Sequence, residues 1–263
     1  MNKLRTLATG KSGQIGSHLS DEIESIEGDL LNCEWKVKND FLNVRTVIHL
    51  AGVVGNHNVN KDKEFAEKVN VIATEKLARF VFENTDARFL HISSSHVYKP
   101  TKDLINEKSE VLPLHEYGKQ KARAEERLLK VFSSEPSRLK IVRAFSVLNL
   151  KMPQGTLGWA MERLLNQNLR FADDVRDFLT ASQIASIIEK LANLEFDEQT
   201  VNICTGVPTS IRDAAHFLLG RGGEIDQYLS PGYSEVPKIV GDPNVLKVAM
   251  GHNYDSLRWS YLP

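Results

Sequence analysis

Residues 9–16 of this chain read Thr-Gly-Lys-Ser-Gly-Gln-Ile-Gly, directly after the apolar segment Leu4–Ala8. Glycines at this spacing allow a tight turn and a close approach of the backbone to a phosphate group. A helix that starts at such a turn presents free N–H groups, which attract negative charge. If residues 4–8 form a strand and residues 13–21 form a helix, the segment has the arrangement of a dinucleotide-binding turn. The glycines alone also fit an ordinary strand-to-helix turn.

The segments that follow alternate between strands and helices. Apolar runs predict strands at 25–30, 46–51, 88–92, 139–144 and 200–204, and the spacing of apolar residues predicts helices at 62–84, 115–132 and 181–194. Nearly continuous apolar strands separated by helices are typical of a parallel sheet that is covered on both faces. We therefore expect an α/β fold, a Rossmann-type doubly wound parallel sheet.

The alternation breaks after Phe145, where the segments shorten and prolines become frequent. We expect a dinucleotide-binding core at 1–145, a smaller substrate-binding lobe at 146–263, and a return of 181–204 to the core. The stretch from Gly16 to Gly28 is too short for a strand, a helix and another strand. Either one strand–helix unit is missing from the sheet, or Ile26–Leu30 is the second strand and the third is lost.

The composition excludes several other classes of protein. The 263 residues are 41% hydrophobic and 25% charged, with a formal net charge of −1. Nucleic-acid-binding proteins usually carry a basic excess, so we expect no nucleic acid partner. Two cysteines outside any C-x-x-C pattern predict neither a disulfide scaffold nor a metal site. There is no apolar run of about 20 residues and no signal-like N-terminus, so we expect no membrane partner and a cytoplasmic location.

Tyr117 and Lys121 lie four positions apart in a predicted helix, so both side chains share one helical face. A lysine ammonium beside a tyrosine phenol favours the phenolate and lowers a phenol pKa that is ordinarily about 10. A tyrosine adjusted in this way can pass a proton to or from a substrate oxygen. By itself the pair also fits an exposed amphipathic helix.

A serine cluster, Ser93–Ser95, follows the predicted strand at 88–92. The carboxyl ends of parallel strands are where ligands of such sheets collect. A serine hydroxyl at this place could hold a substrate oxygen beside Tyr117, although serines also serve as turn and cap residues where a strand ends.

In this order and spacing, the glycine turn, the serine cluster and Tyr117-x-x-x-Lys121 resemble the extended short-chain dehydrogenase/reductase family. That family includes NAD-dependent epimerases, dehydratases and reductases of nucleotide sugars. Asn70-Val71-Ile72-Ala73-Thr74 is similar to its N-x-x-x-T helix segment. Arg176-Asp177-Phe178 and Val201–Gly206 look like the R-D-F/Y and Y-N-x-G segments of its members.

The resemblance implies a role for individual residues. Tyr117 would be the catalytic acid/base, Lys121 would hold the nicotinamide ribose, and Ser94 would be the catalytic serine. NAD or NADP would be the cofactor. The residues implied to bind it are Gly10, Ser12, Gly13, Gln14, Ile15, Asp29, Leu30, Leu50, Ala51, Gly52, Asn70, Tyr117, Lys121 and Ala144. Those implied to bind a nucleotide-sugar substrate are Ser94, His96, Ser146 and Arg176.

Departures from the family pattern leave several choices open. Asp29 lies near the spacing expected for a ribose-binding acid, which would favour NAD, whereas Lys11 could meet the 2′-phosphate of NADP or simply be solvated. Ser94-Ser95-His96 stands where 4,6-dehydratases carry Thr-Asp-Glu, so we do not expect a dehydratase. His96 is either a second acid/base or a histidine hydrogen-bonded in a loop. Ser146 replaces an asparagine common in the family.

Three functions fit these motifs. The first is a reductase of a 4-keto nucleotide sugar, which the likeness of the glycine turn to that of dTDP-4-dehydrorhamnose reductases favours. The second is an epimerase that removes a hydride from the sugar and returns it to the other face. The third is a catalytically silent protein that binds dinucleotide as a sensor. Family members often pair through two long helices, here 62–84 and 115–132, so a homodimer is a further hypothesis.

Overall fold

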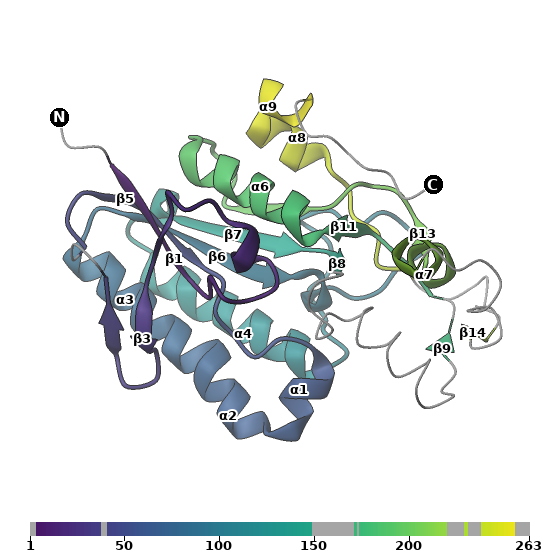
Figure 1. The fold of residues 1–263 in the computed structure, drawn as a ribbon, viewed down its shortest axis with the longest axis horizontal. Coiled ribbons are helices and arrows are strands. Elements are labelled where there is room, and N and C mark those ends of the chain that lie inside the picture. The colour runs from purple at the N-terminus through teal and green to yellow at the C-terminus, as the bar shows by residue number, and fades with distance from the viewer. Residues whose placement is uncertain are drawn as a thin grey trace.

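A computed structural model describes residues 4–37, 41–148, 171–172, 174–219, 229–230 and 238–255. Its centre is a six-stranded sheet in the order β12-β7-β6-β5-β1-β2, with every neighbouring pair parallel (Figure 1). The strands are β1 Arg5–Thr9, β2 Glu24–Ser25, β5 Val44–His49, β6 Arg88–Ser94, β7 Leu139–Ala144 and β12 Thr200–Ile203. This arrangement confirms the predicted doubly wound parallel sheet.

Helices cover both faces of the sheet, as Figure 1 shows. On one face lie α3 (Thr74–Asn84) and α4 (Glu116–Val131), whose apolar residues, including Leu77 and Leu128, pack against Phe89 of β6. On the other lie α6 (Ala181–Asn193) and α8 (Asn244–Met250), which share a core with β6, β7 and β12. β6 is buried along its whole length, as expected for a central strand of such a sheet.

The helix predicted at 62–84 is present but interrupted. After α1 (Asn56–Lys61) the chain forms α2 (Lys63–Glu67), a π-helix (Lys68–Ala73) and then α3. A π-turn displaces the helix phase locally and often marks a functional region. Here it brings Asn70 inward, where its side chain is 1% exposed.

The helix predicted at 13–21 is wrong. The structure has only the 3-10 helix Gly16–His18 there, and the backbone turns back at Ser20 to start β2. Lys11 stabilises this short connection, because its ammonium donates to the carbonyls of Ser20 (3.1 Å) and Ile23 (2.6 Å). Too few residues separate Gly16 from β2 for a longer helix and its return loop.

The strand predicted at 25–30 is divided. Only Glu24–Ser25 (β2) pairs with β1, at the edge of the sheet. The chain then leaves the sheet as an antiparallel hairpin of β3 (Glu27–Asp29) and β4 (Glu34–Lys36). Aromatic contacts of Trp35 and Phe41 with Phe80 anchor this region to α3. Among the described residues no strand extends the sheet beyond β2. This agrees with the short stretch between Gly16 and Gly28.

Small paired strands follow the core. They are β8 (Ser146–Leu148) with β11 (Phe178–Thr180), β10 (Val175–Arg176) with β13 (Thr209–Ser210), and β9 (Phe171–Ala172) with β14 (Leu229–Ser230). The remaining elements are α7 (Ile211–Leu219), α9 (His252–Asp255) and the 3-10 helices Ser95–Val97 and Pro136–Arg138. β12 pairs with β7 in the central sheet, and α6 and α8 pack in the same apolar core. The boundary of the smaller lobe at 146 stays a prediction.

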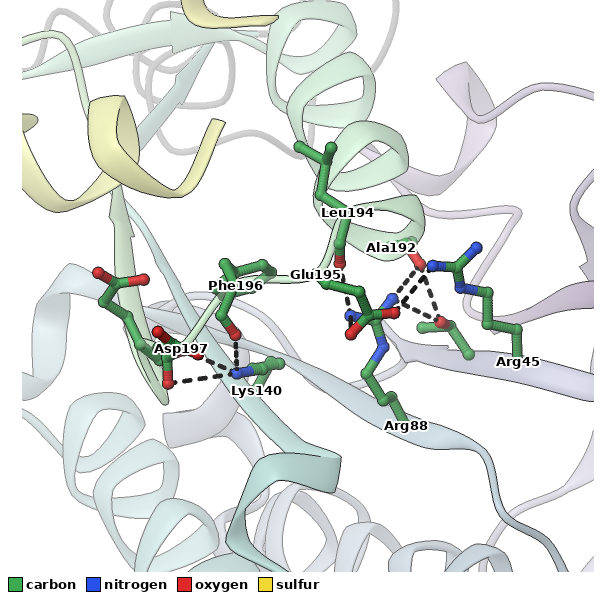
Figure 2. Close-up of polar contacts among 10 residues, drawn as sticks. Arg45, Arg88, Lys140, Ala192, Leu194, Glu195, Phe196 and Asp197 are labelled. Carbon is green, nitrogen blue, oxygen red and sulfur yellow. Dashed lines mark hydrogen bonds and ion pairs between the residues drawn. The ribbon is translucent and has the colours of Figure 1, made fainter. Parts of the chain in front are cut away.

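Cationic side chains at the amino-terminal ends of β6 and β7 bind the end of α6 and the segment that follows it (Figure 2). The guanidinium of Arg88 donates to the carbonyls of Ala192 (2.6 Å) and Leu194 (2.5 Å). The ammonium of Lys140 donates to the carbonyl of Phe196 (2.6 Å), in the segment that leads to β12. Cations at a helix C-terminus satisfy its free carbonyls and complement its dipole. These contacts lie at the amino-terminal ends of the strands, whereas the predicted site lies at their carboxyl ends.

No helix among the described residues is both long enough and apolar enough to cross a membrane.

Candidate active site

Tyr117 and Ser94 meet where β6 ends against the first turn of α4. Both residues are buried, with 7% of each exposed, and the Ser94 side chain is among the groups that shift the pKa of Tyr117. The Ser94 hydroxyl accepts a hydrogen bond from the backbone N–H of His96 (3.2 Å). The catalytic pairing of Ser94 with Tyr117 stays a prediction.

The pKa of Tyr117 is shifted in the direction opposite to the one predicted. Burial raises the pKa of Tyr117 to about 12, and the hydrogen bond with Ser94 opposes this increase. Lys121 does not supply the expected reduction, and its ammonium donates to the Ile92 carbonyl (2.8 Å). At neutral pH the phenol is protonated and can donate its proton.

Gly118 is a site residue that the motif search did not single out. A Cβ at this position would lie 2.2 Å from the backbone carbonyl oxygen of His96. Glycine therefore allows the first turn of α4 to pack against the segment that carries Ser94 and His96. The signal in the sequence was a glycine inside an otherwise strong helical pattern.

His96 lies beside Tyr117, with ring centroids 5.8 Å apart in an edge-to-face arrangement. The pKa of His96 is lowered to about 4, first by burial and then by the positive charges of Arg176 and His115. The imidazole is therefore neutral at physiological pH. Arg176 is itself held by Asp174 through an ion pair of 2.7 Å. Ser94, Tyr117 and His96 therefore lie together, and the charge of Arg176 acts on His96.

Two glycines let the strand ends beside this place pack closely against their neighbours. A Cβ on Gly10, whose φ is +71°, would lie 2.7 Å from the backbone nitrogen of Ala51. A Cβ on Gly52 would lie 2.9 Å from Oδ1 of Asn70 and 4.0 Å from Nζ of Lys121. The predicted residues Gly10, Ala51, Gly52 and Lys121 therefore come together from different elements. A glycine turn that packs closely on the neighbouring strand end is typical of dinucleotide-binding folds.

A chain of buried hydrogen bonds fixes these strand ends and was not foreseen from the sequence. Thr74 donates its hydroxyl proton to the Asn70 carbonyl (2.9 Å), so it accepts from Nε2 of His49 (2.9 Å). Nδ1 of His49 must then accept from the hydroxyl of Thr9 (2.8 Å), which in turn accepts from the N–H of Ala51 (3.2 Å). Burial lowers the pKa of His49 to about 3, which keeps this tautomer neutral.

Asn70 is engaged within the protein. Its side-chain oxygen accepts from the backbone N–H of Val53 (2.7 Å), and its amide donates to the Val53 carbonyl (3.0 Å) and to Gln120 (2.8 Å). Both amide hydrogens are used within the protein, and the side-chain oxygen has one donor. Asn70 thereby holds the loop after β5 against α4, and its contact with a cofactor stays a prediction.

The proposed ribose acid and its alternative are also engaged. Asp29 is exposed in the β3–β4 hairpin, where its carboxylate accepts from the backbone N–H of Leu31 (2.8 Å) and from the Asn32 amide (2.7 Å). Leu30 packs against the apolar core under the hairpin. Lys11 donates to two backbone carbonyls, and its contact with a 2′-phosphate stays a prediction.

The remaining predicted residues surround the same strand ends. Ser12 and Gly13 are exposed on the glycine turn, and Gln14, Ile15 and Leu50 are partly buried. Ala144 is the sheet neighbour of Ser94. Ser146 follows on β8, where its N–H donates to the Asp177 carbonyl (2.9 Å). Among the described residues, no group of three or more His, Cys, Asp or Glu side chains could hold a metal ion.

Comparisons with known proteins find relatives along nearly the whole chain. The chain is 27% identical to GDP-6-deoxy-D-talose 4-dehydrogenase of Aggregatibacter actinomycetemcomitans, over 95% of this chain and 92% of that protein. A solved structure of RMD from Pseudomonas aeruginosa in complex with NADPH superposes with a TM-score of 0.76 at 22% identity, covering 95% of this chain and 93% of RMD. MoeE5 in complex with UDP-glucuronic acid and NAD gives 0.73 at 23% identity, covering 94% and 92%.

These relatives include NAD-dependent enzymes of nucleotide sugars, as the motifs predicted. A shorter match, 27% identical over 48% of this chain and 42% of the relative, is to methionine adenosyltransferase 2 subunit beta of Xenopus tropicalis. Residues 4–202 match the RmlD substrate binding domain family. Since that match covers more than half of this chain, the chain belongs to the RmlD substrate binding domain family.

Proposed function

We propose that this protein is an NAD(P)-dependent oxidoreductase that reduces the 4-keto group of a nucleotide-activated sugar. The observation that carries the proposal is the position of the Tyr117 phenol, buried beside Ser94 and His96 at the carboxyl end of β6. A bound nicotinamide cofactor would supply the hydride to the carbonyl carbon. Tyr117 would give its proton to the carbonyl oxygen, so that the ketone becomes an alcohol.

The other residues have supporting roles in this proposal. Ser94 would orient the sugar oxygen toward Tyr117, and Lys121 would hold the ribose of the cofactor from beneath Gly52. His96, Ser146 and Arg176 would contact the nucleotide sugar. The turn of Gly10–Ile15 would meet the pyrophosphate mainly through backbone N–H groups, since a three-residue 3-10 helix contributes little dipole.

The relative that matches along nearly the whole chain suggests the first substrate to test. It is named a 4-dehydrogenase of GDP-6-deoxy-D-talose, so its reaction joins an alcohol and a ketone at the 4-position. A GDP-linked 4-keto-6-deoxyhexose is therefore the substrate class that we assign to this chain. The same likeness supports NAD or NADP as the cofactor.

The test is to mix the protein with a GDP-4-keto-6-deoxyhexose and either NADH or NADPH, and to follow the loss of reduced-nicotinamide absorbance. We expect one cofactor to be oxidised for each sugar reduced, and we expect Tyr117→Phe to lose activity by about 100-fold or more. Lys119→Ala, an exposed change on the same helix, serves as the control and should retain activity.

The alternatives predict other outcomes. An epimerase would invert the sugar with only catalytic NAD and no net oxidation, and a silent sensor would bind cofactor and turn over no sugar. Either result would overturn the reductase.

A further inference from the structure

Three consecutive residues at the end of β6 face three residues on one side of α4. The Ile92 carbonyl accepts from Lys121 (2.8 Å), and Ser94 lies beside Tyr117 and acts on its pKa. Between them, the Ser93 hydroxyl donates to the carboxylate of Glu125 (2.5 Å). Because Tyr117, Lys121 and Glu125 are each one helical turn apart, they form a single row on α4. Glu125 is the member of this row without an assigned role.

Glu125 is held in a fully satisfied buried network. Its two carboxylate oxygens accept from Arg143 at 3.1 and 2.6 Å, and the side chains of this ion pair are 6% and 8% exposed. Arg143 also donates to the Tyr98 hydroxyl (2.8 Å), which donates to Asn202 (2.8 Å). The network therefore joins α4 to β6, β7 and β12. A carboxylate in such a network has one defined position relative to Lys121.

The groups around Lys121 make Glu125 its charged neighbour. Burial keeps the pKa of His49 and His91 low, and it keeps the pKa of Tyr117 high, so all three are neutral near pH 7. Burial lowers the pKa of Lys121 to about 8, and the charge of Glu125 opposes this reduction. Without that carboxylate, the ammonium would lose its proton closer to neutral pH.

We propose that Glu125 is a positioning residue for the active site: through Ser93 it fixes the end of β6 against α4, and its charge keeps Lys121 cationic. The inference rests on the proposed role of Lys121 in holding the cofactor. Buried ion pairs contribute little net stability compared with apolar residues of similar volume. An electrostatic role next to Lys121 gives this pair a function that packing alone does not.

The experiment measures the binding of NADH and of NADPH to the full chain by fluorescence titration, from neutral to alkaline pH. In the parent protein we expect affinity to fall as pH rises through about 8. In Glu125→Gln the same fall should occur at lower pH, so that affinity at pH 8 is weaker by about threefold or more. Thermal unfolding of each variant reports whether it is folded.

The matched control is Glu75→Gln. Glu75 also pairs with an arginine of α4, Arg127 (2.6 Å), but it is not among the charges that act on Lys121. Its pH dependence should match that of the parent protein. If Glu125→Gln does not fold, the double change Glu125→Leu with Arg143→Met removes both charges and should still bind cofactor weakly near pH 8.

Substitutions at Ser93 separate the positioning role of Glu125 from its electrostatic role. Ser93→Ala should weaken cofactor binding without moving its pH dependence, and Ser93→Thr should restore the binding. An unchanged pH dependence in folded Glu125→Gln, or an equal shift in Glu75→Gln, would overturn the proposal. If the parent protein binds cofactor with no pH dependence at all, the role of Lys121 fails together with this inference. Because binding is measured without sugar, none of these results depends on the sugar that is reduced.

Discussion

Two buried histidines on adjacent strands differ in how their ring nitrogens are satisfied. His49 and His91 face each other across β5 and β6 with ring centroids 5.6 Å apart. Both nitrogens of His49 bond to threonine hydroxyls. Neither nitrogen of His91 has a hydrogen-bond partner among the described residues, although the residue is fully buried. A buried polar group without a partner costs about 1–3 kcal/mol.

We therefore expect His91→Leu to stabilise the protein. At neutral pH the free energy of unfolding should rise by about 1 kcal/mol or more, because the unpaired nitrogens are removed from the core. Burial lowers the pKa of His91 well below its ordinary value, so the unfolded chain binds a proton there that the folded chain does not. The advantage should grow by about 1.4 kcal/mol for each pH unit below 6.5.

Urea unfolding at several pH values tests this expectation. His18→Leu, a change at a histidine of the short connection after the glycine turn, is the comparison for an altered histidine count. A loss of stability at neutral pH in His91→Leu would show that the ring has a partner in the native protein.

At the scale of elements, the position of α6 depends on cationic side chains at the amino-terminal ends of the strands. Arg88 is 9% exposed and bonds to two carbonyls at the end of α6. Arg45 reaches the same region only through an ion pair with Glu195, whose side chain is 76% exposed. Buried charge-assisted hydrogen bonds contribute more than exposed ion pairs, which are worth about 0–1 kcal/mol.

Arg88→Met should therefore lower the free energy of unfolding by about 1–3 kcal/mol, because it removes a donor from the Leu194 carbonyl and leaves the Ala192 carbonyl with the Thr46 hydroxyl. Arg45→Met is the matched control and should cost less than about 1 kcal/mol. Chemical denaturation measures both. Cofactor affinity of folded Arg88→Met should stay at the parental value, since the site lies at the carboxyl ends of the strands. Equal losses of stability in Arg88→Met and Arg45→Met would contradict this account.

At the scale of the whole molecule, Asp177 joins the segments that follow the core. Its carboxylate is fully buried and accepts from the N–H of Thr205 (2.8 Å), Gly206 (2.8 Å) and Gly241 (3.2 Å), and from the Thr205 hydroxyl (2.8 Å). It thereby connects the strands on either side of it, β10 and β11, with the exit of β12 and the segment before α8. Arg176 is its neighbour in sequence.

Asp177→Asn should destabilise the protein by about 2–3 kcal/mol, because an amide group must turn a donor toward backbone N–H groups. We expect KM for the nucleotide sugar to rise more than kcat falls, since Arg176 moves with this connection while Tyr117 does not. Steady-state kinetics together with urea unfolding check this. A variant with parental stability would show that the four contacts are dispensable.

The homodimer stays a proposal at this scale. The helices that would form the interface carry exposed apolar side chains, Phe65 on α2 and Leu129 on α4, which are 49% and 43% exposed. We expect a dimer by light scattering at micromolar concentration and a shift toward monomer in Leu129→Glu. A monomeric parent protein would dismiss the proposal.

The sequence by itself determined the parallel sheet, because apolar runs and helical periodicity are local and survive without tertiary contacts. It also predicted that Ser94, Tyr117 and Lys121 lie near one another, since their spacing places them on a strand end and on one helical face. Only the tertiary structure decided the direction of the pKa of Tyr117, because burial outweighs a nearby ammonium that donates elsewhere. Burial and hydrogen bonding between distant segments likewise occupied Asn70 and Lys11, and no local pattern records such contacts.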